Sequence, residues 1–183
     1  MSGFLLSPEP PSVPLTYSIL KATKHSGQYV PDNILVDKPM DSLSRWSGEG
    51  IGTEQWILLR LEAPSVLKSI TFGKLSKAHP CNMKDFKFLI GPSEDKLTEI
   101  LSASLKNDTI PETFALKHIN SVGIPFPTHY VKIAPISSHA PKFNISIWHV
   151  SMNGINDPVY VAKAQIACEE YREISLRDMR PHL

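Results

Sequence analysis

The chain has 183 residues, 42% of them apolar, and its 19 basic and 18 acidic residues leave a net charge of +1. This length predicts one domain of about 150 residues and a tail. A net charge close to zero argues against a nucleic-acid-binding surface. The sequence contains no apolar run of about 18 residues, so it predicts no membrane-spanning helix. The N-terminal residues lack the basic start and apolar core of a signal peptide, so we expect a cytoplasmic, possibly nuclear, protein.

In chain order, residues 1–14 are rich in proline and predict a flexible N-terminal arm. Residues 17–20 suggest a first strand. Residues 29–46 then combine the apolar run 34–36, expected to be a buried segment, with a polar loop that ends at Trp46. We expect this stretch to close one end of the fold, with Trp46 as an aromatic anchor.

Strand signals then recur at intervals typical of a β-sandwich, separated by loops rich in the chain's 16 prolines. Polar and apolar residues alternate in several of these segments, which indicates one face in a core and one in solvent. The pattern predicts an all-β sandwich of about eight main strands. The expected strands after Trp46 are residues 55–61, 66–72, 86–91, 112–115, 129–136 and 144–152.

Two segments favour helix. Residues 94–105 carry apolar side chains at helical spacing, and they predict either a helix or a short helical turn that joins two strands. From Val161 the residues are helix formers without strand alternation. We therefore expect a sandwich domain over residues 15–158 and a short helical tail over residues 159–183.

Several side chains invite a functional reading. Trp46, Trp56 and Trp148 are each expected to fill the core, the alternative being an aromatic ligand platform. Arg45 could bind a partner carboxylate or make an internal bond to Asp37 or Asp41.

The sequence supplies no pattern for catalysis or for a bound metal. The seven histidines and the two cysteines, Cys81 and Cys168, lack zinc-ligand spacing, and the cysteines are expected as free thiols. No serine lies in a nucleophile elbow. Asp37, Asp41 and Ser44 raise a calcium hypothesis, which we do not favour. We expect neither an enzyme, nor a cofactor, nor a metal site.

Several short runs, in order and over roughly residues 17–175, resemble the amino-terminal part of the muskelin family. Any one of them is weak, whereas their order and spacing are specific. The runs are YVPDNILVDKP with SRWS, ITFGK, CNMK before FK, LKND, ETF with LKH, and FNISIW with GINDP.

The resemblance implies a discoidin-type (F5/8 type C-like, galactose-binding-like) jelly-roll β-sandwich. It also implies a scaffold subunit of the multisubunit CTLH (GID-type) E3 ubiquitin ligase, in which a LisH motif and later kelch repeats follow the discoidin domain. In sugar-binding relatives of this fold a structural calcium takes a carboxylate from the last strand, where this chain has His149. The truncated start of the LisH helix implies a dimerisation tail with Tyr171, Leu176, Met179 and Leu183.

Loops at one end of a jelly roll are the usual binding surface of such domains. Here they are residues 41–52, 76–82 and 137–141, the second made mildly positive by Lys74, Lys77 and His79. Their tips are expected to be mostly polar, which disfavours membrane binding. The candidate partner-binding residues are Arg45, Ser47, Glu49, Lys77, His79, Ser138 and His139.

The leading hypothesis is a non-catalytic assembly module that binds protein subunits of a ubiquitin ligase, a kelch domain or a second copy of itself. The first alternative is a carbohydrate-binding module of the discoidin fold. A second is a discoidin domain like that of the anaphase-promoting complex, against which the muskelin-like tail argues.

Overall fold

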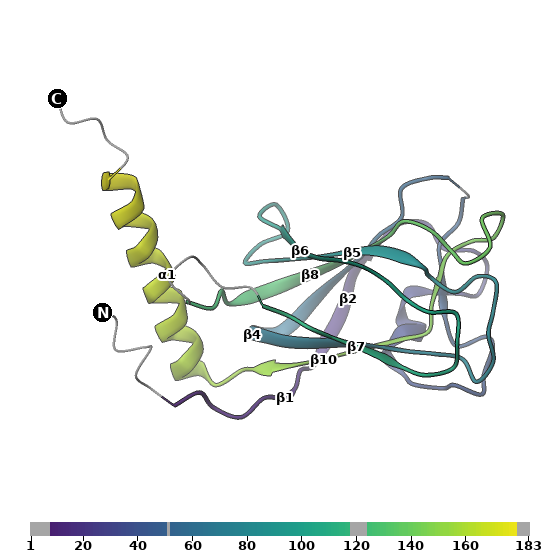
Figure 1. Cartoon of the computed structure of the whole chain (residues 1–183), viewed down its shortest axis with the longest axis horizontal. Helices are drawn as coiled ribbons and strands as arrows, with labels where there is room; N and C mark the ends of the chain where they lie inside the picture. The colour runs from purple at the N-terminus through teal and green to yellow at the C-terminus, as the bar shows by residue number, and fades with distance from the viewer. Residues whose placement is uncertain (1–7, 51, 118–123, 179–183) are drawn as a thin grey trace.

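A computed structural model of the chain describes residues 8–50, 52–117 and 124–178, with the side chains of residues 175–178 left out. The strands form a two-layered β-sandwich (Figure 1). The helix α1 (Pro158–Asp178) lies at one end of the sandwich, and most of the long loops lie at the other end.

The strand β4 (Ile57–Gly73) runs through both layers and joins them. Its first half pairs with β2 (Tyr17–Ala22) and β8 (Thr128–Pro135), and its second half pairs with β10 (His149–Ile155) and β7 (Glu112–Ala115). All four pairings are antiparallel. The register against β8 shifts between Arg60 and Ser65, so the strand changes partners where its sequence reads Ala63-Pro64.

The remaining strands extend the two layers. β5 (Asp85–Gly91) lies between β8 and β6 (Thr98–Ser104), and β1 (Val13–Pro14) pairs with β10. Two short strands, β3 (Trp46–Ser47) and β9 (Ser146–Ile147), form a separate pair near the loops. The 3-10 helix η2 (Pro31–Leu35) packs beside them.

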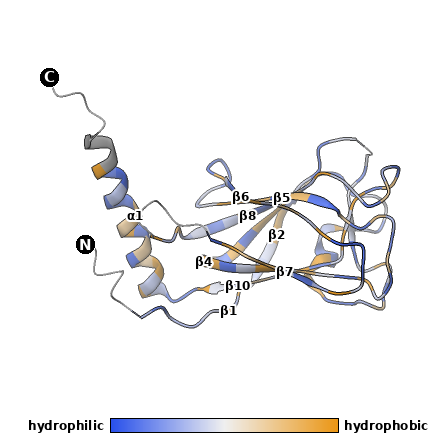
Figure 2. Ribbon diagram, in the orientation of Figure 1, coloured by the Kyte–Doolittle hydropathy of each residue, from blue (hydrophilic) through white to orange (hydrophobic). Residues whose placement is uncertain are grey.

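The core lies between the layers and is built from inward-facing strand residues. The rings of Phe72 on β4 and Phe86 on β5 meet edge to face with 4.9 Å between centroids, and Phe114 on β7 joins them. Figure 2 shows hydrophobic and hydrophilic positions along the strands that form these layers. This arrangement confirms the sandwich and its all-β class with one C-terminal helix.

The predicted strands are largely present, with two differences. Residues 55–61 and 66–72, expected as two strands, belong to the single strand β4. Residues 144–152 are instead divided, because β9 pairs with β3 and β10 pairs with β4. The last residues of the predicted N-terminal arm belong to the sandwich, because Val13 and Pro14 form β1 and the next residue, Leu15, is buried.

Of the two alternatives predicted for residues 94–105, a helix or a short helical turn between two strands, the helix is wrong, because Thr98–Ser104 form β6 against β5. Residues 93–96 instead make a tight turn, in which the Lys96 amide donates to the Ser93 carbonyl. Gly91 makes this turn possible, since a Cβ there would lie 1.9 Å from the Lys96 carbonyl oxygen. Pairing with β5 outweighs the helical spacing of the apolar residues.

The apolar run 34–36 was expected to be buried, and only Ile34 is. Ile34 is fully buried at the end of η2, whereas Leu35 and Val36 are 40% and 51% exposed. The preceding Pro31 fixes φ at the start of the turn and favours the 3-10 helix over a strand.

The first half of α1 packs on the sandwich. Tyr160 and Ala164 form a small core with Val66 of β4 and Ile155 of β10. Glu9 of the N-terminal arm pairs with Lys68 and accepts a hydrogen bond from the Tyr160 hydroxyl, so arm, sheet and helix are held together. In the part of the chain that the structure describes, no helix is long and apolar enough to cross a membrane.

Candidate binding surface at the loop end of the sandwich

Four loops gather at the end of the sandwich opposite α1, and we call this surface the loop end (Figure 1). Backbone hydrogen bonds join the loops to one another. Examples run from Ser76 to Pro39, from Ala140 to Pro80, and from Gly48 to Ile145. The three loops predicted to form a binding surface therefore lie together on one framework. The loop end consists of residues 23–50, 52–56, 74–84, 105–111 and 136–145.

Arg45 lies inside this framework and is only 8% exposed. Its guanidinium carbon is 4.0 Å from the ring centroid of Tyr29 and 5.1 Å from that of Trp148. Its Nη1 donates to the Ser42 carbonyl, whereas its buried Nε has no acceptor. The internal bond to Asp37 or Asp41, one of the two alternatives considered for Arg45, is not formed, since no carboxylate among the described residues pairs with it. Asp41 accepts the Leu43 amide instead.

Trp148 connects the Arg45 loop to the loop between β4 and β5. Its indole Nε1 donates to Oδ1 of Asn82 over 2.6 Å, and the ring of His79 meets it edge on at 5.7 Å. Burial lowers the pKa of His79, and the charges of Arg45 and Lys77 lower it further. The Nδ1 of His79 also accepts the Cys81 amide, which favours the neutral imidazole.

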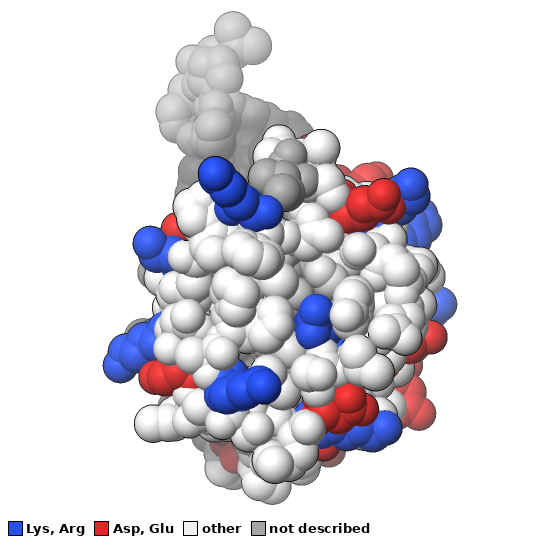
Figure 3. All heavy atoms as spheres, turned by 90° about the vertical axis from the view of Figure 1, so that its right-hand side faces the viewer, with Lys and Arg blue, Asp and Glu red and all other residues white. Residues whose placement is uncertain are grey.

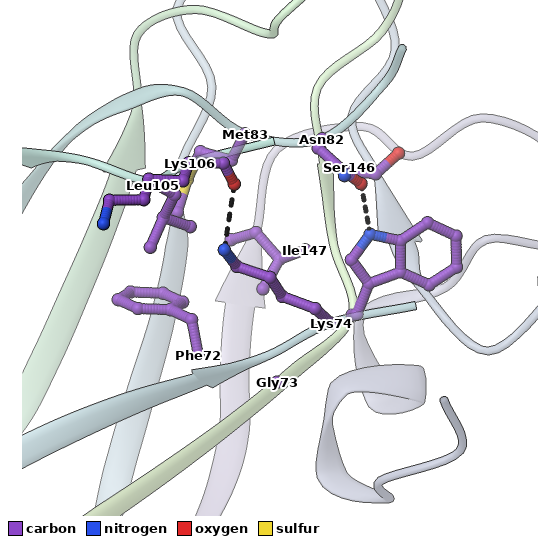
Figure 4. Close-up of a pocket in the computed structure, with 10 residues that line it drawn as sticks. Phe72, Gly73, Lys74, Asn82, Met83, Leu105, Lys106, Ser146 and Ile147 are labelled. Carbon is purple, nitrogen blue, oxygen red and sulfur yellow. Dashed lines mark hydrogen bonds between the residues drawn. The ribbon is translucent and has the colours of Figure 1, made fainter. Parts of the chain in front are cut away.

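Lys74 is an internal cation and does not contribute to a positive loop surface as the sequence suggested. Its side chain is 4% exposed and its Nζ binds Asp108 at 2.5 Å and Glu112 at 2.6 Å. Nζ also donates to the Lys106 carbonyl, a bond drawn in Figure 4 together with that of the indole to Asn82. The space between these residues measures about 10 Å³, room for one water at most, so it is a structural junction.

Apolar side chains are exposed around the loop end, contrary to the expectation of mostly polar loop tips. Figure 3 views this face and shows charged side chains scattered over a largely uncharged surface. A group of exposed apolar side chains on one face is typical of an interaction surface. The residues, with their exposure, are Met40 at 84%, Ile110 at 68%, Ile136 at 55%, and Leu43 and Phe143 at 48% each.

The other residues singled out from the sequence fall into two groups. Glu49 and Lys77 are exposed, and Glu49 pairs with Lys24. Ser47 and Ser138 are buried, and the Ser138 hydroxyl donates to the Ala140 carbonyl. His139 is half-buried, with Nε2 2.8 Å from the Leu105 carbonyl oxygen. Arg45, Ser47 and Ser138 thus belong to the hydrogen-bonded loop framework more than to its exposed surface.

The tryptophans divide in a similar way. Trp46 is fully buried and Trp148 is 6% exposed, as core residues should be. Trp56 is only half-buried, with Lys132 Nζ 4.9 Å from its ring, so its expected place in the core is wrong. Trp56 precedes the first inward-facing residue of β4, Ile57, and therefore points to the opposite face.

Two larger hollows lie outside this junction. One, of about 480 Å³, lies at the loop end and is lined by Phe143, Pro141, Ser137 and Thr53 among others. The second, of about 580 Å³, lies between α1 and the turn from β5 to β6, and the half-buried Tyr171 and Cys168 line it.

Of the proposed dimerisation tail, Tyr171 is the only member whose side chain is described. Leu176 lies in α1 with its side chain outside the described set, and Met179 and Leu183 lie outside the described residues. Within residues 8–50, 52–117 and 124–178, no three His, Cys, Asp or Glu side chains group in a way that could hold a metal ion.

The family model for the muskelin N-terminus matches residues 12–181, nearly the whole chain. The chain is also 36% identical over 170 residues to Mei4-dependent protein 6 of Schizosaccharomyces pombe, a match that covers 88% of this chain. The chain spans about a quarter (24%) of the length of that relative.

Solved structures show the same fold at low sequence identity. The family 32 carbohydrate-binding module of Clostridium perfringens NanJ, solved with galactose, superposes with a TM-score of 0.59 at 14% identity, over 78% of this chain and 99% of the module. An F5/8 type C domain from Bacteroides fragilis gives a TM-score of 0.59 at 13% identity, over 76% of this chain and 91% of that domain. The chain belongs to the muskelin family, of which it carries the amino-terminal, discoidin-type β-sandwich.

Proposed function

We propose that this domain is a non-catalytic assembly module that docks another protein at its loop end. The observation that carries this proposal is the set of exposed apolar side chains, Met40, Leu43, Ile110, Ile136 and Phe143, on loops that hydrogen bonds hold in place. Preorganised loops lose little conformational entropy on binding, so their apolar side chains can contribute most of their burial energy to a complex.

The partner that we propose is a subunit of a CTLH-type E3 ubiquitin ligase. Family membership supports this choice. A kelch domain or a second copy of the chain is a narrower form of the same proposal, in which the partner belongs to the same protein type.

A binding assay with purified ligase subunits tests the proposal. We expect one subunit to bind the chain, and a variant with Met40, Ile110 and Phe143 all changed to serine to bind at least tenfold more weakly. A variant with Val159 and Ile166 of α1 changed to serine is the matched control, because these exposed apolar residues lie at the other end of the molecule. Absence of binding to every subunit, or equal loss in both variants, counts against the proposal.

Carbohydrate binding is the second candidate, favoured by one observation. The hollow of about 480 Å³ at the loop end combines an exposed aromatic ring, Phe143, with the hydroxyl-bearing residues Ser137 and Thr53. Sugar sites commonly pair an aromatic face with converging polar groups. Saturable binding on a glycan array that the Phe143→Ala change abolishes would establish it, and a blank array would remove it.

A further inference from the structure

Arg45 is a buried cation without a countercharge. It is 8% exposed, and no carboxylate of the described residues lies within ion-pair distance of it. Asp41, four residues before Arg45, accepts a backbone amide, and Glu49, four residues after it, pairs with Lys24. A buried charge is costly unless it is paired with an opposite charge or fully hydrogen-bonded. A buried arginine without a countercharge therefore calls for an explanation.

The guanidinium has donors to spare. Nη1 is used by the Ser42 carbonyl, and Nε is buried without an acceptor. Nη2 has no acceptor among the described residues either, yet it is not one of the fully buried unpartnered nitrogens, so it keeps contact with solvent. An approaching anion can thus reach the edge of the guanidinium, the geometry that carboxylates recognise.

The neighbouring side chains hold this donor in place and add positive charge. The guanidinium lies against Tyr29 and Trp148, and two aromatic contacts restrict its orientation before any ligand arrives. The ring of His79 also meets Trp148, and Lys77 lies two residues before His79 in the same loop. Lys77 is exposed, and no described acidic side chain pairs with it.

We propose that Arg45, with Lys77 and His79 beside it, forms a subsite for a carboxylate, which an Asp or Glu side chain of the docked protein occupies. This subsite rests on the proposed function and specifies its partner: an acidic residue flanked by apolar residues. Two exposed apolar residues, Met40 and Leu43, lie on the same loop as Arg45. Leu43 is directly beside it, because the Arg45 amide donates to the Leu43 carbonyl.

A sugar acid also carries a carboxylate, but the surroundings of Arg45 suit a peptide better. A sugar needs several free polar groups around its ring. The amide side chains close by are already used. Nδ2 of Asn33 donates to the Arg45 carbonyl, Oδ1 of Asn82 accepts from Trp148, and Nδ2 of Asn82 donates to Asn107. The sugar acid therefore becomes one arm of the test.

The test is an NMR titration of the ¹⁵N-labelled chain with three probes: the capped peptide Leu-Asp-Glu-Leu, its amide twin Leu-Asn-Gln-Leu, and trigalacturonate. We expect saturable shifts of the Arg45 Nε–H and Trp148 indole signals with the acidic peptide, and at least tenfold weaker binding of the amide twin. Equal binding of both peptides, no shift at Arg45, or a response to trigalacturonate alone would overturn the proposal.

Point variants distinguish the loss of the carboxylate subsite from the loss of the fold. Lys77→Glu changes an exposed side chain and should weaken the acidic peptide at least threefold, while Lys163→Glu, an exposed lysine on α1, should not. Arg45→Lys keeps the charge without the planar fork and should also weaken binding. If a ligase subunit binds wild type and Lys77→Glu equally well, the subsite fails while the docking proposal stands. If no subunit binds, docking fails and the peptide titration still decides the subsite.

Discussion

The indole of Trp148 and the amide of Asn82 form a buried hydrogen bond of 2.6 Å that joins two segments far apart in sequence. Trp148 lies between β9 and β10, and Asn82 lies in the loop that leads to β5. Each residue is nearly excluded from water, so neither finds a replacement partner in solvent. This contact fixes the position of the ring against which Arg45 lies.

Replacing Asn82 with Ala should therefore destabilise the domain by about 1–3 kcal/mol, the cost of a buried donor left unpaired. Asn107→Ala removes an exposed partner of Asn82 and should cost well under half as much. Urea unfolding of the two variants measures both values. Equal losses would show that the indole bond contributes nothing beyond the loop contact.

The Lys74 network gives a pH-dependent prediction. The hydrogen bond from Lys74 holds the pKa of Asp108 below its ordinary value. A depressed carboxyl pKa contributes stability that is present above its unfolded value of about 3.9 and is lost as pH falls through the lower folded pKa. Lys74→Met should therefore lower the melting temperature by at least about 3 °C at pH 7, and by less below about pH 4.

Lys77→Met is the control for this prediction, because Lys77 is an exposed lysine of the same loop. Its melting temperature should stay close to that of the wild type at both pH values. A Lys74→Met difference that is the same at pH 7 and pH 3.5 would argue that Lys74 acts through packing alone.

The docking of α1 is tested by enlarging one helix residue. Ala164 is fully buried against Val66 and Ile155, so Ala164→Leu should overpack this contact and cost about 1–3 kcal/mol. Ala162→Leu, the same change on the exposed side of the helix, should leave stability within about 0.5 kcal/mol. Thermal unfolding followed by circular dichroism compares them. Matching stabilities would mean that α1 does not pack on the sandwich as it does here.

The thiols should be poorly reactive in the folded protein. Burial raises the pKa of Cys81 and of Cys168, and the negative charge of Glu169 raises that of Cys168 further. The thiolate is the reactive form, so a chromogenic disulfide reagent at pH 7.5 should modify both slowly, and Cys81, the more buried, last. Rapid reaction of Cys81 in the native state would contradict this environment.

The sequence predicts those strands whose side-chain pattern reports their surroundings. β5 alternates because one face meets the core, and β7 was placed at its observed bounds. β6 escaped prediction because Ile100, Leu101 and Leu105 are spaced as on a helix, and only pairing with β5 makes the segment a strand. Such pairing depends on residues distant in sequence, which local patterns do not contain.

The loop end, too, could be predicted only where local sequence patterns report on it. That its loops would gather at one end follows from the sandwich, and the sequence placed Arg45 at that end. The partners of Arg45 were not predictable, because Tyr29 and Trp148 reach it from opposite ends of the domain sequence. Exposed apolar loop residues such as Met40 and Ile110 were missed as well. Single hydrophobic residues in a polar loop leave no periodic signal, and their exposure depends on how the loops fold.

Hydrogen–deuterium exchange of the chain, free and bound to the ligase subunit that we propose as its partner, tests most directly whether the loop end is the docking surface. The account predicts slower exchange on binding in residues 38–48, 105–111 and 136–145, and little change in α1 or β6. Protection confined to α1 or β6, with the loops exchanging as in the free chain, would contradict it.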